Sequence, residues 1–293
     1  MSQKILITGA SGHFGGGVLD HLLHLLPADR LIAMARDPQK LQRFADKGVE
    51  ARHGDYDDPA SLEAAFQGVG TVLLVPGGDL QPGKRPGQHR NVVDAAKRAG
   101  VGHILYKGII HHDEPGHGLL ISDHQDTEQM IADSGIKHTF LRDGLYLDVL
   151  PMLWGNAPES GAFPYPTATK GLSVVRRADL AEAAAKVIAD PALHGTTIEL
   201  AAGEPVMLSD VAAAIGTTTG KPVQHVPITL DELRTGMVQH GLPGPVADGM
   251  TGMARAIAEG VVLATNSRLK EILGREPVAM PAFVRSVLQP ADA

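Results

Sequence analysis

Short apolar runs alternate with amphipathic segments along the first two thirds of the chain. The runs have the length and the β-branched content of buried strands, and the segments between them place apolar residues at helical spacing. Strands that alternate with helices in this way predict an α/β fold with a doubly wound parallel sheet. The predicted strands are residues 5–7, 31–35, 49–53, 71–75, 103–107, 138–142 and 197–200, and the predicted helices include 37–47, 59–66, 88–99, 122–133, 178–189 and 209–216.

A glycine-rich turn follows the first predicted strand. The strand ends at Thr8 and is followed by a G-x-x-G-x-x-G spacing ahead of an amphipathic helix. Glycines let the backbone approach a ligand closely, and a helix N-terminus offers unpaired N–H groups to a pyrophosphate. Such turns also occur in chains that bind nothing, but the strand before and the helix after favour a dinucleotide site. The predicted cofactor-binding residues of this turn are Gly9, Ser11, Gly12, His13, Phe14 and Gly15.

The composition changes after about residue 150, where loops rich in proline and glycine replace the regular alternation. The sequence therefore predicts a Rossmann-type NAD(P)-binding domain over residues 1–150, to which 171–200 return. Residues 151–170 and 201–293 are predicted to form a smaller C-terminal α+β subdomain, a lid that covers the substrate.

Overall composition narrows the class of protein. The 293 residues carry a net charge of −7 and include no cysteine, which excludes disulfides, thiolate metal sites and cysteine nucleophiles. The negative charge argues against a nucleic-acid partner, and no apolar stretch approaches the ~18 residues of a membrane span. No secretory pattern precedes the first strand. We expect a cytoplasmic protein, monomeric or homodimeric, that binds neither nucleic acid nor membrane.

Residues at the ends of the predicted strands indicate which dinucleotide binds. Arg36 ends the second strand, where an acidic residue selects NAD and an arginine can pair with the 2′-phosphate of NADP. Asp37 follows directly, so NADP is favoured and NAD stays possible; a solvated arginine at the strand end is the alternative. Further predicted cofactor contacts are Asp55 and Tyr56 at the adenine and Val75, Pro76 and Gly77 along the ribose.

One segment is dense in histidines and carboxylates: His111, His112, Asp113, Glu114 and His117. It has the ligand types of a metal site, but it is a Pro/Gly loop without the helical i, i+4 spacing of paired ligands. We therefore expect a solvated loop bordering the active site and no metal.

Four segments together resemble the NmrA-like family of atypical short-chain dehydrogenases. They are the TGASGHFG turn, the arginine that ends the second strand, GDYDD after the third and TFLRDGLY around the sixth. The likeness is closest to the quinone, triphenylmethane-dye and azo-dye reductase branch, to whose C-terminal lid residues 197–229 are similar. It implies an NADPH-dependent reductase that uses neither flavin nor metal.

The acid/base pair of most short-chain dehydrogenases is missing. They use Tyr-x-x-x-Lys, but none of the four tyrosines, at positions 56, 106, 146 and 165, has a lysine four residues later. The resemblance instead places His124 at the cofactor face, at the start of a helix. Imidazole titrates near neutral pH, so His124 could protonate a reduced substrate, position cofactor or substrate, or be structural. A helix N-terminus would disfavour its cationic form.

The resemblance also implies further site residues. Lys107, Asp143 and Gly144 are expected at the cofactor, and Tyr146 is expected beside the nicotinamide as a second catalytic candidate. Lys107 stands where Ser or Thr is commoner in the group, so it either attracts an anion or points away. Trp154, Met152, Leu153 and Phe163 are candidates for an apolar cover over a flat substrate, and ordinary core packing is the alternative for each.

The absence of the Tyr-x-x-x-Lys pair is explained if the substrate that accepts the hydride is a conjugated compound. A quinone, an azo bond or a triphenylmethane dye delocalises the arriving charge, so hydride transfer needs placement more than acid/base help. We therefore expect a reductase that acts on a small aromatic substrate. The alternative is an NmrA-like regulator that senses NAD(P) and performs no chemistry.

Overall fold

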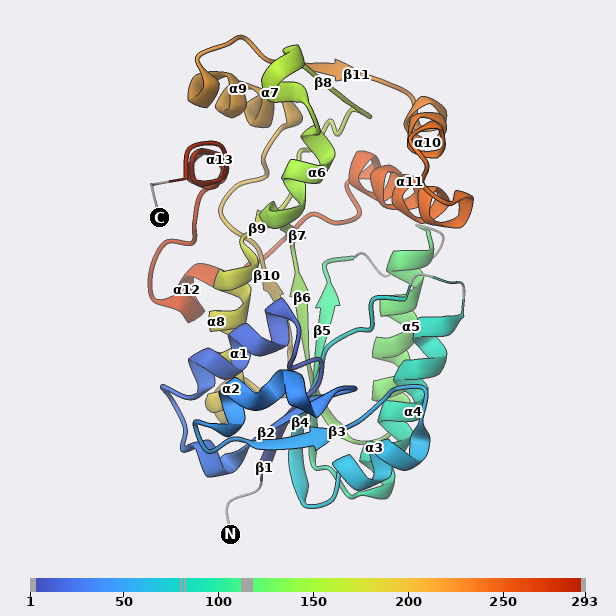
Figure 1. Ribbon diagram of the computed structural model, residues 1–293, viewed down its shortest axis with the longest axis vertical. Helices are drawn as coiled ribbons and strands as arrows, with labels where there is room; N and C mark the ends of the chain where they lie inside the picture. The colour runs from blue at the N-terminus through green and yellow to red at the C-terminus, as the bar shows by residue number, and fades with distance from the viewer. Residues whose placement is uncertain (1–3, 80, 82, 112–117, 291–293) are drawn as a thin grey trace. The chain divides into compact units, whose positions relative to one another are not determined.

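A seven-stranded sheet forms the centre of the fold (Figure 1). In the computed structural model, which describes residues 4–79, 81, 83–111 and 118–290, the strand order is β10-β6-β5-β4-β1-β2-β3. Parallel pairs join β1 to β2 and β4, β2 to β3, and β4 to β5. The strands are β1 (Lys4–Ile7), β2 (Leu31–Ala35), β3 (Glu50–His53), β4 (Val69–Leu74), β5 (His103–Ile109), β6 (Lys137–Asp143) and β10 (Thr197–Leu200). The predicted α/β, doubly wound sheet is confirmed.

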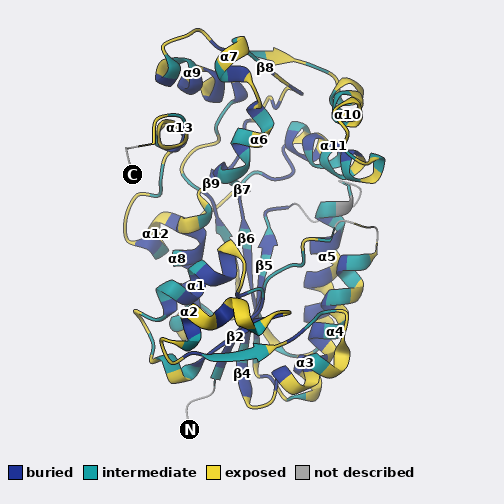
Figure 2. Ribbon diagram, in the orientation of Figure 1, coloured by how far each residue is buried: buried dark blue, intermediate teal, exposed yellow. Residues whose placement is uncertain are grey.

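Helices cover both faces of this sheet, which is why its central strands are apolar on both sides. Figure 2 shows the strands as mostly buried and the outer helix faces as exposed; all five residues of β2 are buried. On one face lie α1 (His13–Leu22), α2 (Gln42–Ala45) and α8 (Arg177–Ala189), and on the other α3 (Pro59–Ala65), α4 (Lys84–Arg98) and α5 (Leu119–Asp133). Four short 3-10 turns are Ala28–Arg30, Pro38–Leu41, Leu147–Val149 and Pro191–Leu193.

Two helices begin earlier than the sequence indicates. α4 starts at Lys84, because Pro86 lies in the first turn, where a proline does not interrupt the helix hydrogen bonds. α5 starts at Leu119: Ser122, whose side chain suggests a cap, instead donates from its hydroxyl to the Gly118 carbonyl at 2.9 Å. His124 therefore lies in the second turn of α5, and the helix dipole acts on it less than predicted.

The chain divides into two compact units, each built from three segments. Unit 1 comprises Met1–Gly108, Asp123–Arg142 and Leu180–Ile198, and unit 2 comprises Ile109–Ser122, Asp143–Asp179 and Glu199–Ala293. The domain boundaries drawn from the sequence stay a prediction.

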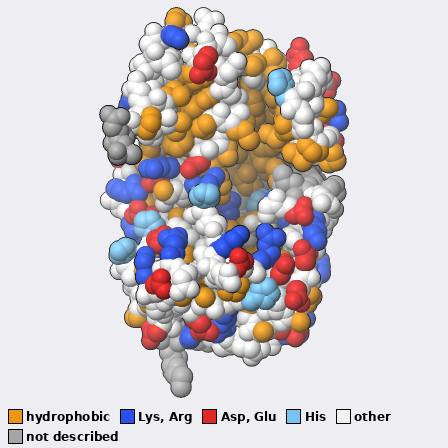
Figure 3. Space-filling view, viewed as in Figure 1, with side chains coloured by type: hydrophobic (Ala, Val, Ile, Leu, Met, Phe, Trp, Pro, Cys, Tyr) orange, Lys and Arg blue, Asp and Glu red, His pale blue; other side chains and the backbone are white. Residues whose placement is uncertain are grey.

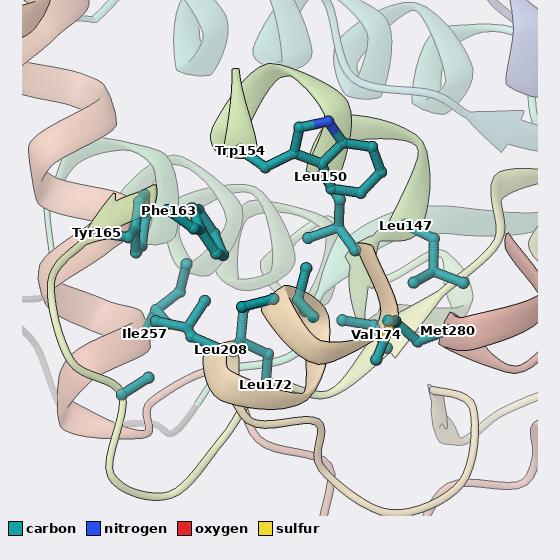
Figure 4. Packing of buried hydrophobic residues seen from close by; sticks show 14 of the residues in the cluster. Leu147, Leu150, Trp154, Phe163, Tyr165, Leu172, Val174, Leu208, Ile257 and Met280 are labelled. Atoms are coloured by element: carbon teal, nitrogen blue, oxygen red, sulfur yellow. The ribbon is translucent and has the colours of Figure 1, made fainter. Parts of the chain in front are cut away.

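Unit 2 contains two small parallel pairs, β7 (Leu145–Tyr146) with β9 (Val174–Val175) and β8 (Ala162–Tyr165) with β11 (Gln224–Pro227). It has a large cluster of buried apolar side chains, and Figure 4 shows Trp154 packed over Leu150 and Phe163 beside Tyr165. Its helices are α6 (Leu150–Trp154), α7 (Ala157–Ser160), α9 (Leu208–Thr219), α10 (Leu230–Gln239), α11 (Gly244–Glu259), α12 (Leu269–Leu273) and α13 (Met280–Leu288).

The surfaces of the two units differ in character. On the face shown in Figure 3, hydrophobic side chains gather over the elements of unit 2, whereas lysines, arginines and acidic residues gather over unit 1. Within the described part of the chain, none of the helices has the length and apolarity to cross a bilayer.

Candidate functional site

The turn after β1 has the geometry of an anion-binding loop. Gly9 has a φ of 59°, and Gly12 is the N-cap of α1, without a side-chain cap or an acidic residue in the first turn. The N–H groups at this helix start are thus not satisfied by a capping side chain. A Cβ on Gly15 would lie 2.6 Å from the Gly9 carbonyl oxygen, so only glycine allows the turn to fold this tightly against α1. A pyrophosphate fits such a turn.

The predicted residues of this turn divide by exposure. Ser11, Gly12 and His13 are exposed, whereas the side chain of Phe14, in the first turn of α1, is buried. Phe14 can therefore face a ligand through its backbone alone. The N–H groups of Ser11, Gly12 and His13, three of the residues predicted to bind the cofactor, are thus in a part of the turn that a ligand can reach.

Three strand ends are tied together beside the turn. The Tyr56 hydroxyl donates to the Val75 carbonyl oxygen at 2.8 Å and is hydrogen-bonded to Thr8 Oγ1 at 2.5 Å. Thr8 Oγ1 in turn accepts from the Val75 N–H at 2.9 Å. Burial of the Tyr56 hydroxyl raises the pKa of this phenol well above its usual range, so it stays protonated. Tyr56 thus connects the ends of β1, β3 and β4 through hydrogen bonds. This structural role is separate from the adenine contact predicted for it.

Two carboxylates and an arginine lie around the ends of β2 and β3. Asp55 accepts the Asp57 N–H on its own side chain at 3.0 Å, which closes the turn after β3. Asp57 is held by Lys84 at 2.7 Å, and this hydrogen bond, with the charge of Arg36 among the smaller causes, lowers the pKa of the Asp57 carboxyl. Arg36 is exposed, and its backbone carbonyl is 2.9 Å from His53 Nδ1. Its guanidinium is thus available to a phosphate.

The segment after β4 is anchored by α4. The Gly77 carbonyl accepts from Arg85 Nε at 3.1 Å, and Val75, Pro76 and Gly77 are all half-buried. Arg85 is itself almost fully buried, and its Nη1 lies 3.9 Å from Asp123 Oδ2 in α5. These are the only polar contacts that the described residues make with its guanidinium. A buried cation is thus present between the starts of α4 and α5.

His124 belongs to a group of buried polar residues, which we call the buried polar cluster. Tyr106 in β5 is fully buried, and its hydroxyl is 2.7 Å from His124 Nδ1. His89 Nδ1 is 2.8 Å from Thr127 Oγ1, and burial, with the charge of Arg85 as the smaller cause, lowers the pKa of His89 to about 3. The cluster comprises Arg85, His89, Tyr106, Asp123, His124 and Thr127.

The strand register places this cluster at the edge of the sheet that carries the glycine turn. Leu74 of β4 is the partner of Tyr106, and the Thr8 N–H donates to the carbonyl of Leu73. Thr8 and Tyr106 therefore lie at the same level, two strands or ~10 Å apart. Ligands of doubly wound sheets bind at this edge, near the β1/β4 switch point. A dinucleotide that starts at the glycine turn would extend toward His124.

Sequence reasoning missed most of this cluster. Arg85 lies in a segment that reads as a loop, and Tyr106 reads as an ordinary apolar strand residue. Lys107 follows Tyr106, is half-buried and has interactions of its own. The resemblance identified only His124, because the other members are joined to it by tertiary packing.

The remaining predicted residues lie in unit 2. Asp143 is buried, its carbonyl accepts from the Ile110 N–H at 2.9 Å, and Gly144 donates to the Leu200 carbonyl at 2.8 Å. A Cβ on Gly144 would lie 2.7 Å from the Ser173 carbonyl oxygen, so close packing alone accounts for this glycine. Tyr146 lies beneath the Arg177 guanidinium, whose carbon is 5.0 Å from the ring centre.

The predicted substrate residues differ sharply in accessibility. Phe163 is completely buried and Trp154 nearly so, and both pack in the core of unit 2 (Figure 4). Met152 is 64% exposed, and Leu153 is half-buried. A completely buried ring cannot contact a ligand without repacking the core, so the alternative, core packing, describes Phe163 and Trp154 better.

A metal centre is not indicated by the part of the chain that is described. No group of three or more ligating side chains occurs there. Of the histidine-rich segment, His111 is buried, and residues 112–117 lie outside the described residues.

Sheet order, switch point and glycine turn together define the class: a doubly wound α/β protein with an anion-binding turn at the sheet edge. Residues 1–271 match the NmrA-like family. Quinone oxidoreductase 2 of Escherichia coli (strain K12) is 35% identical over 280 residues, covering 96% of this chain and 97% of that protein. NAD(P)H azoreductase of Xenophilus azovorans is 27% identical over 287 residues, covering 96% and 97%.

Solved structures agree. The NADPH complex of the NADPH-dependent quinone oxidoreductase QOR2 from Escherichia coli has a TM-score of 0.91 at 33% identity and covers 97% of this chain and 100% of that chain. The NADP(H) complex of the triphenylmethane reductase from Citrobacter sp. has a TM-score of 0.88 at 35% identity and covers 97% and 99%. The chain belongs to the NmrA-like family, and it is an oxidoreductase. The family and the enzyme class predicted from the sequence are confirmed.

Proposed function

We propose that the protein is an NADPH-dependent, flavin-free reductase that transfers hydride to a conjugated aromatic acceptor. The observation that carries the proposal is the turn after β1, whose uncapped helix start and indispensable Gly15 suit a pyrophosphate. Relatives that cover nearly the whole chain are a quinone oxidoreductase, an azoreductase and a triphenylmethane reductase, two of them solved with NADP(H).

The cofactor would occupy the carboxyl edge of the sheet in unit 1. Gly9 to Gly15 would hold the pyrophosphate through backbone N–H groups, and Arg36 would pair with the 2′-phosphate. The nicotinamide of the bound cofactor supplies a hydride. The backbone around Val75 and Gly77 would line its ribose, and Arg85 holds this segment in place through the Gly77 carbonyl.

The residues of unit 1 would orient the cofactor and the acceptor and form hydrogen bonds with them, and a Tyr/Lys pair that donates a proton is not required. A quinone or an azo compound with NADPH and one proton yields the reduced acceptor and NADP⁺, and water is a sufficient proton source. A cationic triphenylmethane dye with NADPH yields the neutral leuco dye and NADP⁺ without a proton. His124 would lie at the same edge of the sheet as the bound cofactor, because its hydrogen-bond partner Tyr106 lies at the same height along the strands as the glycine turn. Asp143, Gly144 and Tyr146 stay candidate contacts, and Met152 is the substrate candidate with the most accessible surface.

Two measurements test this function. NADPH binding is followed by nicotinamide fluorescence, and NADPH oxidation is followed at steady state with 1,4-naphthoquinone, an azo dye and malachite green. We expect NADPH binding in preference to NADH and turnover of at least one acceptor. Tight binding of NADPH and NADP⁺ with equal affinity, and no oxidation with any acceptor, would indicate the sensing role instead. No affinity for either NADPH or NADH would overturn the proposal.

A further inference from the structure

Two charged residues of unit 1 form a buried ion pair near the carboxyl edge of the sheet. Arg85 lies in the first turn of α4 and Asp123 in the second turn of α5, and Arg85 Nη1 is 3.9 Å from Asp123 Oδ2. Their side chains are only 7% and 3% exposed. A charge that is taken out of water is destabilising unless an opposite charge compensates it, so each of the two groups depends on the other.

The same guanidinium holds the segment that follows β4. Arg85 Nε donates to the Gly77 carbonyl at 3.1 Å. A second side chain of α4 fits closely against this glycine, since a Cβ on Gly77 would lie 2.8 Å from Gln88 Oε1. The position of residues 75–77 therefore follows the start of α4, and Arg85 connects that start to α5.

Asp123 supplies the charge that keeps Arg85 in this place. Burial raises the pKa of the Asp123 carboxyl, and the charge of Arg85 opposes this shift, so the two groups interact across the gap between the helices. His89, one turn further along α4, adds no second cation because burial lowers its pKa to about 3. Within the described part of the chain, Asp123 is the acidic side chain that pairs with Arg85.

The strand order relates this segment to the two halves of a dinucleotide. β1 has β2 on one side and β4 on the other. The glycine turn follows β1, Arg36 follows β2 and Gly77 comes after β4, so Arg36 and Gly77 lie on opposite sides of the turn. If Arg36 binds the 2′-phosphate of the adenosine half, the nicotinamide half extends over β4 and past Gly77.

We propose that Asp123 is a positioning residue, which acts through Arg85 to hold residues 75–77 where they bind the ribose of the nicotinamide half of NADPH. This inference rests on the proposed reductase function and deepens it, because it divides the cofactor site into two parts. The adenosine half depends on the glycine turn and Arg36, whereas the nicotinamide half depends on the ion pair between Arg85 and Asp123.

Three ligands that share the adenosine half test this division. NADPH carries both halves, 2′-phospho-ADP-ribose lacks only the nicotinamide base, and 2′,5′-ADP lacks the second ribose as well. Their dissociation constants are measured by isothermal titration calorimetry on the full chain. We expect Asp123→Asn and Arg85→Lys each to weaken NADPH and 2′-phospho-ADP-ribose about tenfold, a typical coupling within one network, and to leave 2′,5′-ADP unchanged.

A double variant covers the case in which a single variant does not fold. Arg85→Met combined with Asp123→Leu leaves no unpaired charge in the interior, but it still removes the hydrogen bond to Gly77. It should show the same selective loss as the single variants. Asp179→Asn is the matched control, because it removes another buried carboxylate that pairs with an arginine, Arg275 of unit 2 at 2.7 Å. It should leave the affinity for all three ligands unchanged.

The pattern across the ligands decides the inference. Equal weakening of all three would show that the ion pair supports the fold in general, and unchanged affinities would show that it does not act on the cofactor; either result overturns the inference. A loss confined to NADPH would assign the contact to the nicotinamide base and also overturns it. A loss shared by NADPH and 2′-phospho-ADP-ribose alone supports it. If the wild type binds none of the three ligands, the proposed function itself fails, and no variant is needed to see this.

Discussion

The glycine turn after β1 and the buried polar cluster lie at the same edge of one sheet, but they are built from different parts of the chain. The turn presents backbone N–H groups, and its side chains Ser11 and His13 are exposed. The cluster presents side chains, and Tyr106 and Thr127 are completely buried. Binding at the turn therefore depends on the space that glycines leave, whereas the cluster depends on protonation states and partners.

This difference predicts how each region responds to change. A backbone site has nothing to titrate, so it should be insensitive to pH and to substitution of its exposed side chains. A buried network of polar side chains should be sensitive to both, because each unpaired or newly charged group in a dry interior is strongly destabilising. The predictions below test this contrast, beginning with the largest effect.

Gly15→Ala tests the backbone site most severely. Its Cβ would lie 2.6 Å from Gly9 O and 2.9 Å from Thr8 O, both backbone atoms that cannot move aside alone. We expect NADPH binding to weaken about 100-fold, measured as Kd by fluorescence titration, because overpacking of ~3 kcal/mol is directed at the turn itself. Gly87→Ala, a helical glycine with no heavy atom within 4 Å of the added Cβ, is the matched control and should leave Kd unchanged. An unaltered Kd in Gly15→Ala would remove the backbone account.

His89 tests the titration of the cluster. Its pKa is about 3 in the folded protein and about 6.5 in the unfolded chain. The unfolded chain therefore binds more protons between these pH values, and stability is lost as the pH falls from 6.5 toward 3. We measure the free energy of unfolding with urea at pH 7 and at pH 4.5. Between these two pH values it should fall by about 2 kcal/mol less in His89→Asn than in the wild type.

The control for His89 is a histidine outside the cluster. His24→Asn, at an exposed position, should keep the pH dependence of the wild type. If the free energy of unfolding depends on pH in the same way in His89→Asn and in the wild type, the burial of His89 does not govern acid stability.

Arg36 tests whether one side chain adds selectivity to the backbone site. Its exposed guanidinium at the end of β2 is expected to pair with the 2′-phosphate. Arg36→Ala should weaken NADPH binding about fivefold and leave NADH binding unchanged, as one solvent-exposed phosphate contact is worth about 1 kcal/mol. Arg90→Ala, exposed on α4, should affect neither cofactor. Equal weakening of both cofactors would assign Arg36 a structural role.

Tyr56 joins the two regions, and its hydroxyl gives the smallest expected effect. Tyr56→Phe removes the hydrogen bonds to Thr8 and Val75. We expect a loss of about 1 kcal/mol in the free energy of unfolding, with less than about threefold change in the Kd for NADPH, because the glycine turn keeps its own backbone geometry. A large loss of NADPH affinity would show that the turn depends on this side chain.

The turn could be predicted from the sequence because its signal is local. A strand, three glycines and a helix are adjacent, and the clash that makes Gly15 indispensable involves only Thr8 and Gly9. The doubly wound parallel sheet followed from the alternation of apolar runs and helices, and the family from motifs that lie at the strand ends.

The cluster could not be predicted because its members meet only through packing. Arg85 and Asp123 are 38 positions apart, and Tyr106 gives no local sign that its hydroxyl reaches a helix. Trp154 and Phe163 illustrate the opposite case. An aromatic residue in a proline-rich segment suggests a ligand surface, but α6 and β8 direct these two rings into the interior of unit 2.

The last strand of the central sheet has a consequence for synthesis of the protein. β6 ends at Asp143 and its neighbour β10 begins at Thr197, so the 53 residues 144–196 must be translated between them. At ribosomal rates this takes about 3–10 s, during which one rim of the nascent sheet has exposed peptide groups. The central sheet can therefore be completed only after the first two segments of unit 2, Ile109–Ser122 and Asp143–Asp179, have been translated.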